Sequence, residues 1–361
     1  MNVVIRADSS NIIGTGHVMR CLALAKELEE ANTNINFICR ESQGNLSKWI
    51  KKNGFGVFGI PVSNDERMNL VFEQDFDSCE TISIIKKMEK TIDWLIVDHY
   101  DIDIGWERIL RPYAKNIMVI DDLANRVHDC AVILDQNLFF NMSERYDALV
   151  SNDCVRLLGP QYALLRKEFR SSRLRHPRRL ASRSGQIMIS FGGSDPGNDT
   201  LKVLEAVEGL ALQNVAIKVV IGGANPNKAE IMKKCAEMDY VKYYFQVDDM
   251  SELMEESDLF IGGGGSTVWE RCCIGLPGIV IPIAYNQVNP MKELAKAGII
   301  HLYEGEKSVR GYMDEIEFAM SNLTYLNDLA IKGMKIYDGA GTIRVSKCMR
   351  RICREYSSTL S

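Results

Sequence analysis

Two stretches of the sequence combine residue types and spacings that could do chemistry, and the first is the turn Gly14–His17. A predicted apolar strand, residues 2–7, leads into this turn, and a helix follows directly. The start of a helix presents N–H groups that attract anions, and its positive end disfavours protonation of an imidazole. Glycine lets a ligand approach the backbone closely. His17 is therefore a candidate base beside Gly14 and Gly16, the alternative being a capping or packing histidine.

The second stretch is Gly262–Ser266, which lies between an apolar strand and a predicted helix. Four successive glycines cost conformational entropy on folding, and a tight turn needs only one or two of them. The run therefore predicts a backbone cradle for a diphosphate at the start of the helix, rather than a turn alone. Glu270 follows one helical turn after Ser266 on the same face, where its carboxylate could accept hydrogen bonds from a ribose.

Other ligand motifs fit the sequence poorly. The turn Gly14–His17 lacks the third glycine of a dinucleotide fingerprint and the lysine of a phosphate-binding P-loop. Asp101 and Asp103 form an Asp-x-Asp pattern, which some glycosyltransferases use to hold a metal, but they lie far from the glycine cradle in sequence and fit a solvated loop better. His, Cys and carboxylate residues show no metal-ligand spacing. We therefore expect neither a metal nor a cofactor.

The chain between these motifs alternates predicted strands and helices. Continuous apolar strands indicate a parallel sheet covered on both faces, and several end in polar residues at the edge where such sheets bind ligands. The pattern restarts after residue 185, which predicts two doubly wound α/β domains that face each other across a cleft. We predict an N-terminal sugar-binding and catalytic domain over 1–160, a linker over 161–185, and a C-terminal nucleotide-binding domain with a helical tail over 186–361. Predicted strands cover 2–7, 35–39, 57–60, 94–97, 117–120, 131–134, 186–191, 215–221, 241–245, 259–261 and 279–283.

The composition is that of an ordinary globular protein of two domains. The 361 residues carry a net charge of -5, which argues against a nucleic-acid partner. A basic run from Arg170 to Arg183 is either a solvated linker face or a contact for an acidic partner. There is neither a secretory signal nor an apolar run long enough to span a bilayer, and the ten cysteines lack a C-x-x-C pair. We expect a cytoplasmic monomer.

The second half of the sequence resembles the nucleotide-binding half of GT-B sugar-nucleotide enzymes. The glycine cradle, Glu270, Gly275-Leu276-Pro277 and Asn286-Gln287 look most like the MurG-type N-acetylglucosaminyltransferases. The segment Val247–Leu253 resembles the part of that group that holds the uracil. This resemblance implies a GT-B fold and a UDP-sugar ligand.

Motifs in both halves resemble the UDP-sugar hydrolases of pseudaminic acid biosynthesis, whose relatives include spore-coat polysaccharide enzymes. These motifs are Arg6–Ser10, Ile13–Leu22, Val97–Tyr100, Tyr162–Phe169 and Phe191–Asp195. The resemblance implies a metal-independent nucleotide-sugar hydrolase of the EC 3.6.1 type, which releases UDP from UDP-2,4-diacetamido-2,4,6-trideoxy-β-L-altropyranose. It places the catalytic base on His17 and further active-site residues on Tyr100 and Asn286. The predicted UDP-binding residues are Gly14, Gly16, Gly192, Gly193, Met250, Gly264, Gly265, Ser266, Thr267, Glu270 and Gln287.

These residues suit hydrolysis by an activated water. His17 would take a proton from water as it attacks the anomeric carbon with C–O cleavage, and Asp8 would orient the imidazole. The glycine cradle would stabilise the departing diphosphate. Two alternatives remain: a MurG-like glycosyltransferase, in which His17 deprotonates an acceptor hydroxyl, and a binding protein without catalysis. The sequence leaves open the stereochemistry of the sugar and the role of the helical tail.

Overall fold

The chain folds into two compact units, each built on one parallel sheet. The computed structural model describes residues 1–361 apart from 30–32, 63–72, 176–184, 246, 248 and 360–361. Unit 1 comprises Met1–Leu164 and Ala340–Ser361, and unit 2 comprises Leu165–Gly339. The predicted class of two doubly wound α/β domains is confirmed.

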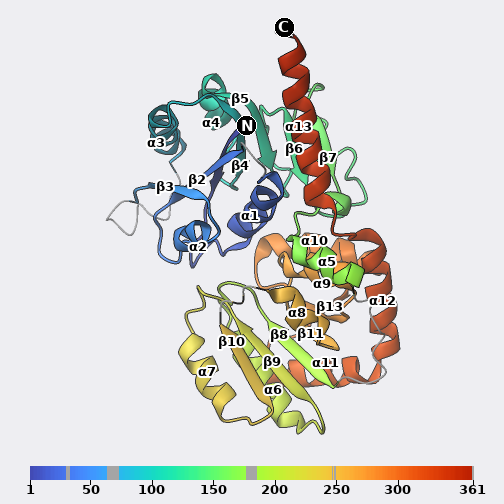
Figure 1. The fold of residues 1–361 in the computed structure, drawn as a ribbon. Coiled ribbons are helices and arrows are strands. Elements are labelled where there is room, and N and C mark those ends of the chain that lie inside the picture. The colour runs from blue at the N-terminus through green and yellow to red at the C-terminus, as the bar shows by residue number, and fades with distance from the viewer. Residues whose placement is uncertain (30–32, 63–72, 176–184, 246, 248, 360–361) are drawn as a thin grey trace. The chain divides into compact units, whose positions relative to one another are not determined.

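Unit 1 contains a seven-stranded sheet with the order β3-β2-β1-β4-β5-β6-β7 (Figure 1). Its strands pair in parallel, and the order reverses between β1 and β4, which is where sheets of this type bind ligands. The strands are β1 (Asn2–Ala7), β2 (Asn34–Arg40), β3 (Gly56–Ile60), β4 (Ile92–Asp98), β5 (Ala114–Ile120), β6 (Val132–Asp135) and β7 (Val155–Leu158).

Side chains of the central strand β1 alternate between two apolar layers, as the pleat of a strand requires. Val3, Ile5 and Ala7 pack in the layer that contains α1 and α13, whereas Val4 packs in the layer of α3 and α4. Each fully buried valine or isoleucine contributes roughly 1.5–3 kcal/mol, so this two-sided burial fixes the strand in the middle of the sheet. The helices are α1 (Gly16–Leu28), α2 (Ser47–Lys52), α3 (Gln74–Lys87), α4 (Ile104–Leu110) and α13 (Gly341–Thr359).

Unit 2 contains a six-stranded parallel sheet with the order β10-β9-β8-β11-β12-β13. One of its faces packs on α6, α11 and α12 through a single apolar layer. The strands are β8 (Gln186–Ser190), β9 (Ala216–Ile221), β10 (Val241–Phe245), β11 (Leu259–Gly263), β12 (Gly278–Ile281) and β13 (His301–Leu302). The helices are α5 (Lys167–Arg175), α6 (Asp199–Leu210), α7 (Lys228–Ala236), α8 (Met250–Glu255), α9 (Thr267–Ile274), α10 (Tyr285–Lys296), α11 (Val309–Ser321) and α12 (Leu323–Ile336).

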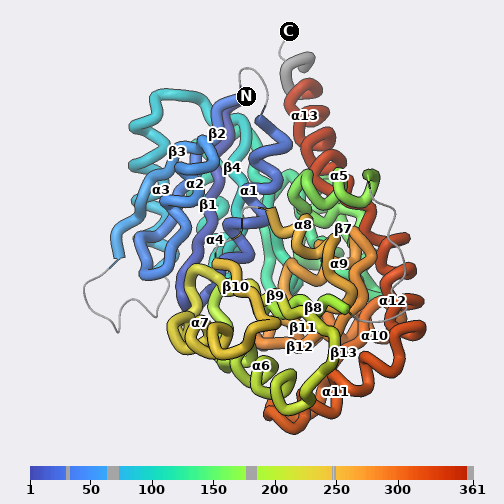
Figure 2. The backbone as a smooth tube through the Cα atoms, turned by 60° about the horizontal axis from the view of Figure 1, so that its bottom comes forward, coloured from blue at the N-terminus to red at the C-terminus, as the bar shows by residue number. Residues whose placement is uncertain are grey.

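The end of the chain belongs to unit 1, so the prediction that residues 186–361 form one domain is wrong for the last helix. Figures 1 and 2 both show α13, in red, beside the blue N-terminal elements. Val345, Met349 and Ile352 enter the apolar layer of α1. In addition, the Trp94 indole donates to Cys353 Sγ at 3.0 Å, and Arg350 donates to the carbonyl of Leu28 at 3.3 Å.

The predicted linker over 161–185 is also corrected, because its middle forms α5 within unit 2. Phe169 of this helix is fully buried. Arg173, from the predicted basic run, donates to the carbonyls of Cys273 and Met334 at 2.9 and 2.7 Å, which satisfies acceptors near two helix ends. This arginine is therefore structural, and the rest of the run from 176 to 183 lies outside the described residues.

Candidate active site

His17 lies in the first turn of α1, with Tyr100 against its ring. The imidazole is 7% exposed, and the Tyr100 ring meets it edge-on with centroids 4.6 Å apart. Nδ1 lies 3.1 Å from the main-chain oxygen of Asp98 and 3.2 Å from its Oδ1. A carbonyl and an ionised carboxylate only accept hydrogen bonds, so Nδ1 carries the hydrogen. Nε2 therefore keeps its lone pair, and it bonds to none of the described residues.

The surroundings of His17 keep its imidazole neutral at pH 7. Burial lowers the pKa of His17 below its ordinary 6.5, and the positive charge of Arg20 lowers it too. The charges of Asp98 and Asp122 raise this pKa but do not outweigh the lowering. The sequence predicted a neutral imidazole from the helix dipole, but burial is the larger cause. A neutral imidazole with a free Nε2 lone pair can accept a proton, which is what a general base requires.

Asp98 ends strand β4 and is fully buried beneath α1. Arg20 donates from Nε and Nη2 to its two carboxylate oxygens, each at 2.6 Å, and from Nη1 to Asp122 at 2.9 Å. Burial favours the protonated carboxyl, but Arg20 outweighs it and holds the pKa of Asp98 below its usual value. His17 and Arg20 are three residues apart, so both lie on the helix face above this carboxylate.

Asp8 is not beside His17, so the prediction that Asp8 orients the imidazole is wrong. Its carboxylate accepts from Arg6 Nη2 at 2.9 Å and from the Arg40 N–H at 2.7 Å, and it lies 3.2 Å from His99 Nε2. The reason is the alternation along β1. Ala7 faces the layer of α1, so Arg6 and Asp8 point to the other side of the sheet.

The two glycines before His17 have different reasons to be glycine. Gly14 has φ +81°, a conformation that favours glycine, and exchanges main-chain hydrogen bonds with Ser10 at 2.9 and 3.2 Å. A Cβ on either glycine would meet no atom within 4 Å, but Gly16 does not have a positive φ. The fold therefore requires Gly14 for the turn, whereas Gly16 leaves the backbone before His17 open to a ligand.

The predicted glycine cradle of unit 2 divides into a packing half and an open half. Gly262 lies within β11, where a Cβ would be 1.9 Å from the main-chain oxygen of Ser190 on β8. Gly262 is therefore required for the packing of β11 on β8, and the prediction of a diphosphate cradle over all of Gly262–Ser266 is wrong for this residue. A Cβ on Gly265 would instead meet only Gln287 Nε2, at the ordinary contact distance of 3.8 Å.

The open half of the glycine run leads into the start of α9. Ser266 is the N-cap without a side-chain hydrogen bond, and the N–H groups of Ser266 and Thr267 donate to no atom of the described residues. Unpaired N–H groups at a helix start form an anion site. The Gln287 side chain lies over Gly264 and Gly265, and its Oε1 accepts from the Ile283 N–H at 2.9 Å.

Asn286 precedes Gln287 in the first turn of α10 and is exposed. It belongs to unit 2, whereas the other two predicted catalytic residues, His17 and Tyr100, belong to unit 1. Within unit 2, Asn286 directly precedes Gln287, whose side chain lies over Gly264 and Gly265.

Glu270 forms an ion pair with Arg166, a residue that the predicted UDP-binding set does not include. Arg166 Nη2 donates to Oε1 at 3.2 Å. Burial raises the pKa of Glu270, and the charge of Arg166 opposes that rise. Oε2 receives no hydrogen bond from the described residues, so one oxygen is available to a ribose hydroxyl.

The remaining predicted UDP-binding residues lie in two further turns of unit 2. Gly192 has φ +79°, and a Cβ on Gly222 would lie 2.5 Å from Gly193 Cα, so the turn after β8 packs tightly on the end of β9. Met250 is the first residue of α8, and Asp249 caps that helix by accepting from the Ser251 N–H at 2.9 Å. Residue 248 of the predicted uracil segment lies outside the described residues.

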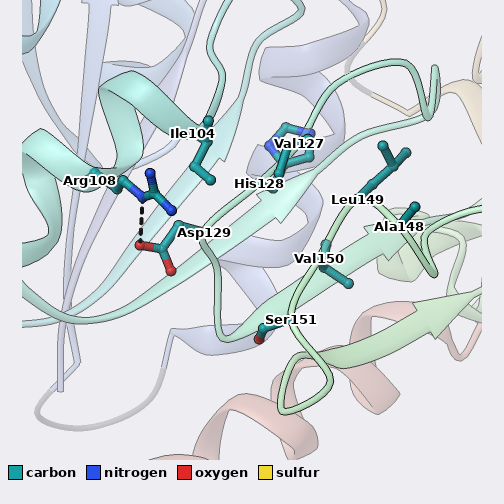
Figure 3. A pocket seen from close by; sticks show the side chains of 9 residues that line it. All are labelled: Ile104, Arg108, Val127, His128, Asp129, Ala148, Leu149, Val150 and Ser151. Carbon is teal, nitrogen blue, oxygen red and sulfur yellow. Dashed lines mark ion pairs between the residues drawn. The ribbon is translucent and has the colours of Figure 1, made fainter.

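A pocket of unit 1 contains no residue of the predicted site. Figure 3 shows its walls, including the ion pair between Arg108 and Asp129 at 3.9 Å. The same wall includes His128, whose Nδ1 lies 2.6 Å from Glu107 Oε1. No group of three or more His, Cys, Asp and Glu residues in the described parts of the chain could hold a metal ion. No helix in those parts is long and apolar enough to cross a membrane.

Sequence reasoning missed the buried charges that surround the candidate base. Aspartates were noted at the carboxyl ends of strands, but their partners were not. Arg20 could have been noticed from the sequence, because it is a cation three residues after His17 within the otherwise apolar run from 18 to 25. Further along the same edge, burial raises the pKa of Asp135 to about 7. The Tyr146 hydroxyl lies within hydrogen-bond distance of both Asp121 and Asp135, at 3.1 and 3.3 Å.

Comparison with known proteins agrees with the resemblance inferred from the motifs. Residues 187–315 match the Glycosyltransferase family 28 C-terminal domain. The Campylobacter jejuni protein named UDP-2,4-diacetamido-2,4,6-trideoxy-beta-L-altropyranose hydrolase is 27% identical over 300 residues, covering 82% of this chain and 97% of that protein. Uncharacterized protein MJ1062 of Methanocaldococcus jannaschii is 28% identical over 315 residues, covering 81% of this chain. The chain spans only 61% of the length of MJ1062.

The fold is that of GT-B proteins. The crystal structure of MurG from Acinetobacter baumannii superposes with a TM-score of 0.63 at 15% identity, covering 97% of this chain and 99% of MurG. The predicted GT-B class is therefore confirmed, and the chain resembles both the UDP-sugar hydrolases and the MurG-like proteins.

Proposed function

We propose that this protein is a hydrolase that releases UDP from UDP-2,4-diacetamido-2,4,6-trideoxy-β-L-altropyranose, the compound in the name of the Campylobacter jejuni relative. The observation that carries the proposal is the state of His17. Asp98 holds the hydrogen on Nδ1, so the Nε2 lone pair is available next to Tyr100. An imidazole in this state can take a proton from water near neutral pH.

In the proposed reaction, the oxygen of water forms a bond to the anomeric carbon while Nε2 of His17 takes its proton. The bond between the anomeric carbon and the UDP oxygen breaks, and UDP leaves with the electron pair. The free sugar retains the hydroxyl from water. General-base catalysis of this kind contributes roughly 10²–10⁴ in rate. Tyr100 holds the imidazole from its edge, and Asn286 would contact the sugar.

Unit 2 would bind the nucleotide in this proposal. The N–H groups of Ser266 and Thr267 suit the diphosphate, and the open backbone at Gly265 allows its close approach, whereas Gly264 packs against Met291 and Gln287. Glu270 would accept a hydrogen bond from the ribose through Oε2. The remaining contacts would come from the predicted UDP-binding residues Gly14, Gly16, Gly192, Gly193, Met250 and Gln287.

The proposal includes three further statements. Stabilisation of the diphosphate by main-chain N–H groups makes a metal unnecessary, so activity should survive a chelator. The substrate is a small molecule, since a net charge of -5 does not suit nucleic acid. The protein would act as a monomer in the cytoplasm.

One experiment separates this function from its alternatives. The protein is incubated with the UDP-sugar in water enriched in oxygen-18, with and without a chelator, and UDP and sugar are measured by mass spectrometry. Release without an acceptor, with the heavy oxygen in the sugar, is the expected result. Release that requires an added acceptor would indicate a glycosyltransferase instead. Heavy oxygen in the phosphate would contradict C–O cleavage. Binding of the UDP-sugar without any release of UDP would indicate a binding protein without catalysis.

A further inference from the structure

The proposed reaction uses Asp98 through its contact with Nδ1 of His17, but it assigns no part to Arg20, which pairs with Asp98 beneath the imidazole. We propose that Asp98 and Arg20 are positioning residues for His17: Asp98 fixes the hydrogen on Nδ1, and Arg20 neutralises Asp98 so that the imidazole remains an uncharged base. This inference rests on the proposed role of His17 as the base and deepens it.

The first step is geometric and concerns Asp98. Its main-chain oxygen and its Oδ1 lie at 3.1 and 3.2 Å from the same nitrogen of His17, so one residue determines which ring nitrogen holds the hydrogen. Both carboxylate oxygens also accept from Arg20, at 2.6 Å each. The Asp98 carboxylate is therefore held by Arg20 on one side and contacts His17 on the other, so it also holds the imidazole in place.

The second step is electrostatic and concerns Arg20. A buried carboxylate 3.2 Å from an imidazole stabilises the imidazolium, which has no lone pair to accept a proton. Arg20 opposes this effect, because its positive charge lies against the same carboxylate. The charged residues facing His17 are Arg20 on its own helix, Asp98 at the end of β4 and Asp122 after β5, while the Tyr100 ring packs against the imidazole. Arg20 is the cation of this set.

A second histidine in unit 1, His128, lies against the carboxylate of Glu107, to which no arginine of the described residues donates. His128 lies 2.6 Å from Glu107, whose other oxygen accepts from the main-chain N–H of Asp129. Burial alone would lower the pKa of His128, but the hydrogen bond with Glu107 and the carboxylate of Asp121, 3.8 Å from Nε2, raise it to about 9. His17 also lies against a carboxylate and is also buried, yet its pKa is lowered. Asp98 accepts two hydrogen bonds from Arg20, whereas Glu107 accepts none from an arginine of the described residues. The second carboxylate near His128, that of Asp121, does pair with Arg126 at 3.0 Å.

Nuclear magnetic resonance of the full chain with isotope-labelled histidine tests the proposal, since only five histidines are present. The His17→Gln variant identifies the His17 signal. We expect the unmodified protein to carry the hydrogen on Nδ1 of His17 throughout the neutral range. In Arg20→Gln, the pKa of His17 should rise by about 1 unit or more, the size of shift that a nearby charge produces. Arg20→Lys, which keeps the cation, should shift it less.

A matched control is Arg40→Gln, which removes another partly buried arginine of unit 1 that pairs with Asp77 rather than Asp98. It should leave the His17 signal unchanged. The acid limb of UDP release should move to higher pH in Arg20→Gln by the same amount as the signal, which general destabilisation would not produce.

The outcomes separate this proposal from the proposed function. A hydrogen on Nε2 of His17 in the unmodified protein overturns the positioning role, and this measurement needs no variant to fold. An unshifted pKa in Arg20→Gln also overturns it, even if UDP is released normally. If the pKa shifts as expected but no UDP-sugar is hydrolysed, the ion pair still sets the state of His17, and the hydrolase assignment fails.

Discussion

The carboxyl ends of the strands carry different residue types in the two units. Both are parallel sheets whose order reverses beside their first strand, so the carboxyl ends of equivalent strands lie at equivalent places. In unit 1 those ends carry aspartates, which are the buried Asp8, Asp98, Asp121 and Asp135 and the partly buried Asp122. In unit 2 they carry glycines: Gly192, Gly193, Gly222, Gly264 and Gly265.

This difference shows what each edge can contribute to a reaction. A charged network fixes the protonation state of a side chain such as His17, because every nearby carboxylate and arginine shifts its pKa. A glycine edge brings main-chain N–H groups close to an anion and supplies them without a proton transfer. The predictions below test whether this division of chemistry between the units holds.

The largest expected effect is on turnover in unit 1. His17→Asn removes the Nε2 base and should reduce the rate of UDP release by roughly 10²–10⁴, the contribution of a general base. Calorimetry should find UDP affinity close to that of the unmodified protein, because the proposed nucleotide contacts lie largely in unit 2. Turnover that survives the substitution would make His17 a structural residue.

The next effect concerns the stability of the charged edge. Arg6 is fully buried and donates to both Asp8 and Asp77. Arg6→Met leaves two buried carboxylates without this partner, so the free energy of unfolding should fall by about 3–5 kcal/mol at neutral pH. Urea denaturation measures the loss.

The pH dependence of that loss provides the check. Arg6 holds the pKa of Asp8 well below its usual value, so this stabilisation is present above the unfolded pKa of 3.8 and disappears as the pH falls. The difference between Arg6→Met and the unmodified protein should therefore shrink in acid. A difference that stays constant down to acid pH would mean that lost packing, rather than lost charge, destabilises the variant.

A smaller effect separates the packing glycine from the open one in unit 2. Gly262→Ala places a Cβ 1.9 Å from the Ser190 oxygen, and overpacking of this kind should cost about 1–3 kcal/mol of unfolding free energy. Gly265→Ala meets only Gln287, so it should change stability by less than about 0.5 kcal/mol but weaken UDP binding. Equal stability of the two variants would contradict the division of the glycine run.

The smallest effect is a pH slope that arises in unit 1. The pKa of His128 is raised from 6.5 to about 9, so its stabilising contribution is complete below pH 6.5 and is lost as the pH rises towards 9. The loss cannot exceed about 1.4 kcal/mol per pH unit, the limit for one proton. Glu107→Gln removes one cause of the raised pKa and should move the loss to lower pH. Identical slopes in thermal unfolding of the two proteins would disprove this account.

The sequence alone predicted the parts of the fold that depend on local pattern. Continuous apolar runs identified most strands of both sheets, since burial on both faces leaves no polar alternation. Two short strands were missed: β13 has only two residues, and the charged Arg156 interrupts the apolar run of β7. The glycines and His17 identified the candidate site, because those residue types have few other reasons to occur together in a turn.

Tertiary structure decided what the sequence could not. The return of α13 to unit 1 depends on which apolar layer accepts Val345 and Met349, and an amphipathic helix fits either unit by pattern alone. Tertiary structure likewise decided that Asp98, rather than the predicted Asp8, lies beside His17. Asp98 is 81 residues from His17 in sequence, and only the parallel pairing of β1 with β4 brings it under α1. Sequence spacing reveals neighbours on one helix, but contacts between distant strands arise only when the sheet has formed.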